Sequence, residues 1–358
     1  MRILIITGSY PPMKCGVGTY TQKLAMALAE SKNVKVTVLT DERASEVIER
    51  NGVEVLSVIR SWRVTGLIQI AKYILQSNPD IIHIQYPTQG YSGRMPMLMP
   101  LLMHLLRKHC VQTWHEPVLS GRSSWLLTIG LEVLITVREE IMASTPKFIQ
   151  RALRGTRLAW IPAASLLPTV MLSDEERSKI RHHVISNNEV LLSYYGFLAP
   201  LKGIEILFEI VAKTKAHLLM ACDFQPNDDY HKSLLDKIKT MGIESYITIM
   251  GFLPEVQLAS ILAASDAVVL PFRDGGGPWN TSIDGAIAQG TFVLTTSLIA
   301  SGYNEEKNVY FAKPGNVDEM IFSIQTYAGC RISSKPPISE WRNIAEQHLS
   351  IYKQLITA

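Results

Sequence analysis

The sequence GFLPEVQLASILAASDAVVLPFRDGGGPWNTSIDGAIAQG, residues 251–290, decides the fold class of the protein. A helical pattern over 256–264 precedes the apolar run 267–270, which is short enough for a buried strand. Three glycines, 275–277, follow this run, and Asn280-Thr281-Ser282 begins another helical pattern. The combination predicts an anion site, because free N–H groups at a helix start attract negative charge. A loop that only caps the next helix is the alternative.

A related arrangement opens the chain. The apolar run 2–7 predicts a buried parallel strand, and Gly16-Val17-Gly18 leads into a helical pattern. A second strand is expected over 34–39, which completes a βαβ unit with glycines in its first loop. The spacing does not match the GxGxxG fingerprint of dinucleotide sites. Two glycine loops, one in each half, predict two α/β domains that face each other across a cleft.

Short apolar runs alternate with helical patterns along the whole chain, which predicts doubly wound, Rossmann-like parallel sheets. Strands of the first domain are expected at 3–6, 34–39, 53–58, 81–84, 111–113, 141–143 and 158–161. Strands of the second are expected at 190–196, 217–221, 247–250, 267–270, 291–295 and 309–311. The polar stretch 173–188 predicts a short helix and a hinge. We therefore expect domains over 1–185 and 186–337, followed by a terminal helical segment, 338–358.

Five motifs, in this order, resemble the retaining glycosyltransferases of family 4. They are SYPPMKCGVGTY (9–20), IIHIQYP (81–87), WHEP (114–117), GFLAPLKG (196–203) and GFLP…ASDAVVLPF (251–272). The family has the two-domain GT-B fold and moves a sugar from a nucleotide diphosphate sugar to an acceptor without a bound metal. The resemblance implies a hexosyltransferase-type enzyme that builds a surface polysaccharide or glycolipid on a glycan or lipid-linked acceptor. It also implies that the terminal helix crosses back to the first domain.

The resemblance assigns roles to particular residues. His115 would orient the donor sugar, Lys202 would offset the phosphate charge, and Asp274 would bond a sugar hydroxyl. The expected donor-binding residues are Gly16, Gly18, Gly196, Lys202, Gly251, Phe252, Leu253, Asn280, Thr281 and Ser282. By the residues alone, a structural histidine and an ordinary loop lysine are the alternatives. No cofactor is implied, since the nucleotide sugar is a substrate, and the cleft loops show no HExxH, CxxC or DxD metal motif.

The sequence departs from the family pattern at three positions. The two family glutamates, eight positions apart, correspond to Gly277 and Gly285, and a family arginine corresponds to Phe197. A branch with a Pro-Phe-x-Asp-Gly pattern is the nearer match, and Arg273 could replace the missing cation. The departures keep two alternatives open. One is a non-catalytic glycosyltransferase-like partner or scaffold, and the other is a different GT-B enzyme, such as a sugar-nucleotide epimerase.

Composition indicates a compact globular protein, with 47% hydrophobic and 19% charged residues among 358. The four cysteines are widely separated in the sequence, which indicates reduced thiols and not disulfides. The start of the chain shows no signal-peptide pattern, so a cytoplasmic protein is expected. The basic residues form no cluster interleaved with aromatic residues, which argues against nucleic-acid binding.

The net charge of +3 is unevenly distributed, with +7 in residues 1–180 and −4 in the remainder. Two very apolar stretches, 95–109 and 125–137, lie in the basic half, flanked by Arg94, Arg107, Lys108 and Arg122. Core helices explain these stretches most simply. Peripheral contact with the inner face of the cytoplasmic membrane is the alternative.

Overall fold

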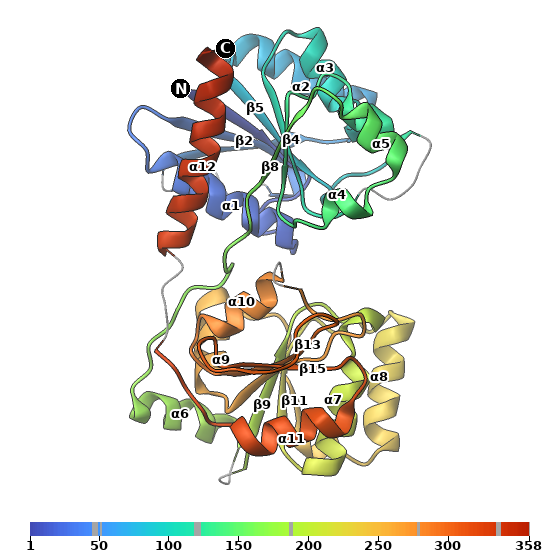
Figure 1. Cartoon of the computed structure of the whole chain (residues 1–358), viewed down its shortest axis with the longest axis vertical. Helices are drawn as coiled ribbons and strands as arrows, with labels where there is room; N and C mark the ends of the chain where they lie inside the picture. Colours follow the sequence, from blue (N-terminus) through green and yellow to red (C-terminus); the bar gives the residue numbers. More distant parts are fainter. Residues whose placement is uncertain are drawn as a thin grey trace. The chain divides into compact units, whose positions relative to one another are not determined.

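The computed structural model describes residues 1–44, 49–50, 52–117, 123–185, 189–277, 280–333 and 338–357. The chain forms two compact units, and Figure 1 follows it through both. The first unit consists of Met1–Ala163 with Ile338–Ala358, and the second of Ala164–Pro337. Each unit contains one sheet in which nearly all neighbouring strands are parallel. The predicted α/β class is therefore confirmed.

The sheet of the first unit has the strand order β3-β4-β2-β1-β5-β6-β7-β8. Its strands are β1 (Arg2–Ile6), β2 (Lys35–Asp41), β3 (Glu49–Arg50), β4 (Val53–Ile59), β5 (Ile81–Tyr86), β6 (Cys110–Trp114), β7 (Val133–Thr136) and β8 (Arg157–Trp160). The short β3 runs antiparallel to β4, and the other described strands of this sheet are parallel to their neighbours. The central strands are buried on both faces, as the apolar runs of the sequence predict.

Helices cover both faces of this sheet. They are α1 (Gly16–Ala29), α2 (Val64–Ser77), α3 (Met99–Leu105), α4 (Ile141–Ser144), α5 (Lys147–Ala152) and α12 (Ile338–Thr357), with the 3₁₀ turns η1 (Glu42–Ala44), η2 (Met95–Leu98) and η3 (Ser124–Thr128). The connections β1–β2 and β4–β5 step along the sheet in opposite directions, so right-handed crossovers place α1 and α2 on opposite faces. The terminal helix α12 packs beside α1 (Figure 1).

Two local predictions for this unit are wrong. Residues 141–143, expected as a strand, lie in helix α4. Residues 125–137, expected as a core helix, form η3 and then strand β7. Gly130 lies between these two elements and has φ +73°, which a continuous helix does not allow. A Cβ at this position would lie only 2.3 Å from His104 Cβ, so glycine is required there. The strand β7 fills the place in the sheet between β6 and β8, so 141–143 is not needed there.

The sheet of the second unit has the strand order β11-β10-β9-β12-β13-β15-β14. Its strands are β9 (Leu191–Tyr195), β10 (His217–Ala221), β11 (Ile247–Ile249), β12 (Ala267–Leu270), β13 (Phe292–Thr296), β14 (Gly302–Asn304) and β15 (Val309–Ala312). The six strands expected here are confirmed within one or two residues. The edge strand β14 is antiparallel and carries too short a pattern to be predicted.

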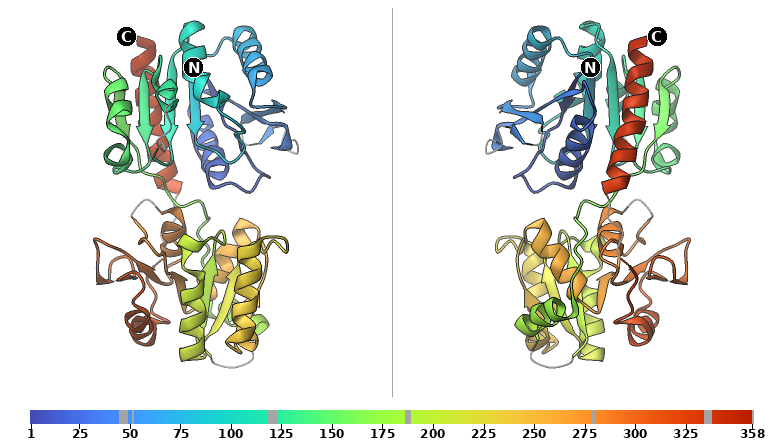
Figure 2. Two further views of the ribbon diagram at one scale, coloured as in Figure 1. Left: turned by 90° about the vertical axis from the view of Figure 1, so that its right-hand side faces the viewer. Right: turned by 90° about the vertical axis from the view of Figure 1, so that its left-hand side faces the viewer.

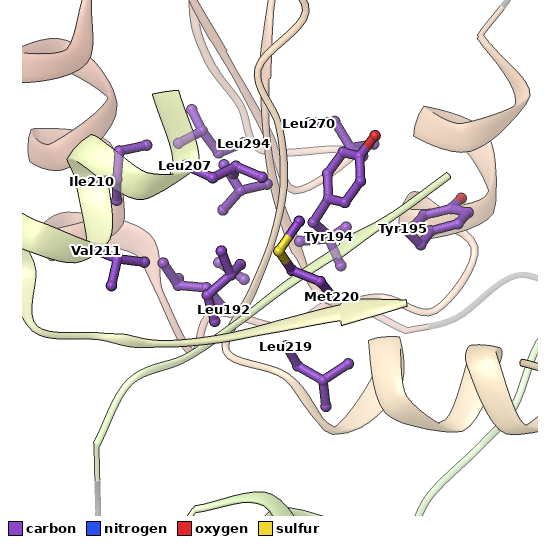
Figure 3. Packing of buried hydrophobic residues seen from close by; sticks show 14 of the residues in the cluster. Leu192, Tyr194, Tyr195, Leu207, Ile210, Val211, Leu219, Met220, Leu270 and Leu294 are labelled. Carbon is purple, nitrogen blue, oxygen red and sulfur yellow. The ribbon is translucent and has the colours of Figure 1, made fainter. Parts of the chain in front are cut away.

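The helices of this unit also form two layers, which the side views in Figure 2 display. They are α6 (Asp174–Val184), α7 (Ile204–Thr214), α8 (Asp229–Thr240), α9 (Glu255–Ala264), α10 (Thr281–Ile287) and α11 (Val317–Tyr327), with the turns η4 (Pro200–Lys202) and η5 (Glu244–Tyr246). Figure 3 shows alternation along β9, where Leu192 and Tyr194 point toward α7 and Tyr195 points to the other face.

The chain passes between units earlier than the predicted boundary at residue 185. Helix α6 belongs to the second unit, because the Arg181 guanidinium pairs with Asp266 at 2.8 Å. Arg331 holds the segment that leaves this unit. It donates to the carbonyl oxygens of Ala263 and Ser265, both at 2.7 Å, at the C-terminal end of α9. Part of the predicted hinge, 186–188, lies outside the described residues.

We expect Arg331→Ala to lower the free energy of unfolding of the second unit by about 2–4 kcal/mol, because half-buried carbonyl oxygens lose a charged donor. Urea unfolding followed by circular dichroism measures this change. The matched control is Lys213→Ala, which removes an exposed cation paired with Asp318 at 2.9 Å and should change stability by less than about 0.5 kcal/mol. Equal effects of the two substitutions would contradict the assignment of Arg331 as an anchor.

Candidate functional site

In the second unit, predicted site residues follow the carboxyl ends of three strands of the parallel part of the sheet. Gly196 follows β9, the Gly251–Leu253 segment follows β11, and a loop with Asp274 follows β12. Since parallel strands end at the same edge of a sheet, these segments lie along one edge, where open α/β sheets bind ligands. Phe252 is 59% exposed and Asp274 is exposed. The sequence predictions for this unit therefore fall on one edge.

Two of these loops touch at Gly203. This residue has φ +69°, and a Cβ on it would lie only 2.0 Å from the Pro271 carbonyl oxygen. The contact continues in a hydrogen bond of 3.0 Å from the Arg273 N–H to the Leu201 carbonyl. Only glycine permits both the left-handed backbone and the close approach. The loops after β9 and β12 are consequently joined by their backbones.

This junction determines where Lys202 lies. Lys202 is the last residue of η4, and its Nζ stands 4.7 Å from the centroid of the Phe272 ring. A cation over an aromatic face is attracted by the ring quadrupole, so the ring orients the ammonium group. Sequence reasoning did not identify Phe272 as the support for the lysine. The structure therefore places an oriented ammonium group at the carboxyl edge of the sheet.

Arg273, the suggested replacement for the missing family arginine, already has an acidic partner. Its guanidinium lies 3.0 Å from the Glu205 carboxylate, near the start of α7. Burial opposes ionisation of Glu205, but its own backbone amide and Arg273 outweigh this and lower its pKa. The charge of Arg273 is thus partly neutralised. Phe197, at the position of the family arginine, is 47% exposed.

The position of the second family glutamate is filled from across the unit. A Cβ on Gly285 would stand 2.5 Å from the Tyr195 hydroxyl oxygen, and this hydroxyl donates to the Ser282 carbonyl. Leu167 lies 3.3 Å from the same Cβ position. Tyr195, which is 8% exposed, therefore occupies the space that a longer side chain at residue 285 would require. The sequence does not reveal this exchange, because the two residues are 90 positions apart.

One of the free backbone N–H groups at the start of α10 is occupied by the helix's own N-cap. Asn280 Oδ1 accepts a hydrogen bond of 3.1 Å from the Ser282 N–H, which satisfies one of the free helix-start donors. Thr281 and Ser282 are partly exposed at this start. Asn280 thus has a structural role that the sequence prediction gave only as the alternative.

In the first unit, the two predicted donor-binding glycines lie in α1. Gly16 is its first residue and has open space around the position of a Cβ. Gly18 packs closely, since a Cβ there would lie 3.0 Å from the Ser9 carbonyl oxygen. Among the residues that the structure describes, no side chain caps the start of α1, and no acidic residue stands in its first turn. Close packing against Ser9 therefore explains why residue 18 is a glycine, whereas Gly16 leaves the start of the helix accessible.

His115 follows β6 directly and is 8% exposed. Its backbone N–H donates to the Tyr86 carbonyl at 2.9 Å, which extends the pairing of β5 and β6. Its Nε2 lies 2.8 Å from Gln85 Oε1, and its ring packs edge-on against Tyr20, with centroids 4.7 Å apart. The backbone and the ring of this histidine are both fixed.

A series of buried, hydrogen-bonded polar side chains leads from His115 into the sheet. Gln85 Nε2 lies 3.3 Å from His83 Nε2, which is also 2.7 Å from Thr113 Oγ1. On its other side, His83 Nδ1 lies 2.6 Å from the Tyr352 hydroxyl of α12. Sequence reasoning selected His115 alone. The available signal was the polar alternation of His83 and Gln85 within the apolar strand IIHIQYP.

Burial keeps these histidines neutral. It lowers the pKa of His115 to about 3, with Arg138 and His348 contributing in the same direction. It lowers the pKa of His348 to about 4 and holds that of His83 well below its usual value. His115 is therefore a neutral imidazole, the form that the orienting role implied by the resemblance would require.

Comparisons with known proteins give the family. The model for "Glycosyltransferase Family 4" matches residues 15–149, and the model for "Glycosyl transferases group 1" matches 189–328. The chain belongs to the family 4, group 1 glycosyltransferases. The matched ranges include His115 and Lys202, one in each unit. A search of curated proteins finds no significant match.

Solved structures agree on the fold of this glycosyltransferase. Sucrose-phosphate synthase from Thermosynechococcus elongatus is similar with a TM-score of 0.72 at 16% identity, covering 100% of this chain and 99% of that one. HepE of Anabaena with UDP-glucose gives 0.70 at 17%, covering 100% and 98%. UDP-GlcNAc 2-epimerase from Methanocaldococcus jannaschii gives 0.60 at 12%, covering 99% and 100%. The fold is GT-B, with two Rossmann-like units.

In the part of the chain that the structure describes, no group of three or more His, Cys, Asp and Glu residues of the glycosyltransferase is arranged to hold a metal ion. No helix in the same part of the chain has both the length and the hydropathy to cross a bilayer.

The lowered histidine pKa values predict acid sensitivity of the first unit. Between pH 6.5 and the lower folded pKa values the unfolded chain binds more protons, so stability falls as pH falls, by up to about 1.4 kcal/mol per pH unit for each histidine. We expect His348→Gln to lose less stability than the wild type between pH 6.5 and 4.5. Urea unfolding, followed by tryptophan fluorescence, measures this difference. Parallel pH profiles for the two proteins would contradict it.

Proposed function

We propose that the chain is a metal-independent, retaining hexosyltransferase that moves a sugar from a nucleotide diphosphate sugar to a glycan or lipid-linked acceptor. The observation that carries the proposal is the joined pair of loops at Gly203 and Pro271, which holds Lys202 at the carboxyl edge of the second sheet. The family matches and the UDP-glucose complex of HepE support a nucleotide sugar as the donor. The acceptor would serve surface polysaccharide or glycolipid synthesis.

The chemistry requires relief of charge on the departing nucleoside diphosphate. The bond between the anomeric carbon and the phosphate oxygen breaks, and its electron pair leaves with the diphosphate. A new bond forms from an acceptor hydroxyl oxygen to the same carbon, and the hydroxyl proton passes to the diphosphate or to solvent. Lys202 would stabilise the charge that develops on the leaving phosphate. Backbone N–H groups with Thr281 and Ser282 would bind the diphosphate in place of the glutamates.

Other residues would bind the nucleobase and the sugar of the donor. Phe252 would stack on the nucleobase, next to backbone groups of Gly251 and Leu253, while Asp274 would bond a sugar hydroxyl. His115, neutral and buried, would orient the donor sugar. Its backbone and ring are fixed in the free protein, so little ordering is required on binding.

A lipid-linked acceptor is supported by the surface of the first unit. Leu105 and Trp125, from the two very apolar stretches, are 69% and 45% exposed, although Met99, Met103 and Leu127 of the same stretches are buried. Exposed Phe148 stands on α5, next to Lys147. Apolar side chains among cations suit a peripheral position on an anionic membrane at its cytoplasmic face. Arg122 lies outside the described residues.

A donor panel with chelator tests the proposal. The purified protein is incubated with nucleotide sugars and lipid-linked or glycan acceptors in excess EDTA, and the anomeric configuration of the product is determined by NMR. We expect transfer with retained configuration and no loss of rate on chelation. Strict dependence on Mg²⁺ or Mn²⁺ would overturn the metal-independent mechanism. If calorimetry detects no binding of any nucleotide sugar, the chain is instead a non-catalytic partner.

We expect Lys202→Ala to lower both donor affinity and turnover, with a total loss in kcat/KM of about 2–4 kcal/mol, since it removes a cation from the leaving phosphate. Steady-state kinetics with varied donor measures both parameters. Lys215→Ala is the matched control, because Lys215 Nζ also rests over an aromatic ring, 5.3 Å from the Tyr246 centroid, but before β10 at the other end of the strands. Unchanged kinetics in Lys202→Ala would remove this lysine from the site.

A further inference from the structure

The buried polar side chains next to His115 take no part in the proposed function. His83 and Gln85 are two residues apart on β5, so they point to the same face of the sheet. Thr113 pairs with Gln85 in the parallel register of β5 and β6, and His115 is two residues further on. All four lie on the face that α12 covers, because Tyr352 reaches His83 there. The register therefore gathers four polar side chains under the terminal helix.

We propose that Tyr352, His83 and Gln85 form a hydrogen-bond chain that fixes the proton of His115 on Nε2 and leaves Nδ1 as an acceptor for a hydroxyl of the donor sugar. The three are positioning residues, and only His115 would touch the ligand. The assignment of the sugar hydroxyl rests on the proposed function. The location of the proton does not, since it is a property of the free protein.

The direction of each hydrogen bond follows from the donors and acceptors available. Gln85 Oε1 can only accept, so at 2.8 Å the His115 Nε2 must carry the proton and donate. Gln85 Nε2 can only donate, so the His83 Nε2 facing it at 3.3 Å accepts, as it also does from the Thr113 hydroxyl at 2.7 Å. His83 therefore carries its own proton on Nδ1 and donates it to Tyr352 Oη at 2.6 Å.

The amide of Gln85 couples the two imidazoles. Its oxygen and nitrogen face different rings, so an amide rotation exchanges a donor for an acceptor at both rings at once. A change of tautomer at His83 is then transmitted to His115. The terminal helix α12, which is more than 200 residues away in sequence, thus contributes to the hydrogen-bonding character of His115.

The proton position decides whether His115 Nδ1 accepts a hydrogen bond from a sugar hydroxyl or donates one to it. His115 Nδ1 makes no hydrogen bond to the described part of the chain, whereas Nε2 is occupied by Gln85. A bare imidazole nitrogen accepts a hydrogen bond, and a sugar hydroxyl can supply one. A protonated Nδ1 would donate instead, and the hydroxyl oxygen would then have to accept the hydrogen bond. A fixed tautomer therefore provides orientation without the ordering cost of a free ring.

Imidazole nitrogen NMR tests the proposal in the free protein. With ¹⁵N-labelled histidine, and His115→Gln to assign the signals, we expect the His115 proton on Nε2 in the wild type. Gln85→Met removes both the acceptor and the donor, and Tyr352→Phe removes the acceptor of the His83 proton. Each should move the His115 proton to Nδ1, in the second case through rotation of the Gln85 amide. A wild-type proton on Nδ1, or an unchanged His115 tautomer in either folded variant, would overturn the proposal.

The matched control is Tyr20→Phe. This substitution also removes one buried tyrosine hydroxyl next to the histidines, but the Tyr20 hydroxyl has no hydrogen-bond partner in the described structure, so the His115 tautomer should not change. With an active donor identified, Gln85→Met should also lower kcat/KM about tenfold, the effect of one lost oriented hydrogen bond. A protein without transferase activity would refute the proposed function and leave the NMR result valid. A changed tautomer with unchanged kinetics would overturn the role in sugar binding.

Discussion

The backbone contact between Gly203 and the Pro271 carbonyl is the constraint on which the rest of the second unit's site depends. It joins the loop after β9 to the loop after β12, and it places the ammonium group of Lys202 beside the ring of Phe272. Two neighbouring parallel strands give the loops a common edge, but strand spacing alone leaves them separate. The left-handed conformation of Gly203 closes the remaining distance, which no residue with a side chain could do without moving the Pro271 backbone.

The first unit is organised around the opposite kind of constraint, a set of polar groups within an apolar sheet. Each buried polar atom costs about 1–3 kcal/mol when it has no partner. The chain from Tyr352 to His115 satisfies this requirement with side chains from β5, β6 and α12. Burial in turn holds the histidines neutral, so the same network that stabilises the unit also sets the chemical state of the residue expected to meet the donor.

The departures from the family pattern have a physical explanation in the second unit. Gly285, at the position that the resemblance assigns to a glutamate, lies where the Tyr195 hydroxyl fills the space, and that hydroxyl supports the backbone at Ser282. Arg273, the suggested substitute for the cation absent at Phe197, is paired with Glu205, which neutralises part of its charge. In the proposed function, backbone groups, hydroxyls and Lys202, supported by Phe272, would therefore take a larger share of donor binding than the family pattern implies.

The sequence by itself determined the two α/β units, almost every strand and the family, because apolar runs of strand length and the order of five motifs are local properties of the chain. It also placed His115 at a strand end and Lys202 in the loop that follows a strand, where the rule for parallel sheets puts ligands. It failed at 125–143, where an apolar run of intermediate length fits a helix or a strand and only the vacant place in the sheet selects β7. The tertiary structure alone decided the partners of the site residues. Tyr352 and His83, Tyr195 and Gly285, and Gly203 and Pro271 are far apart in the sequence, so their contacts depend on register and packing, which no local pattern encodes.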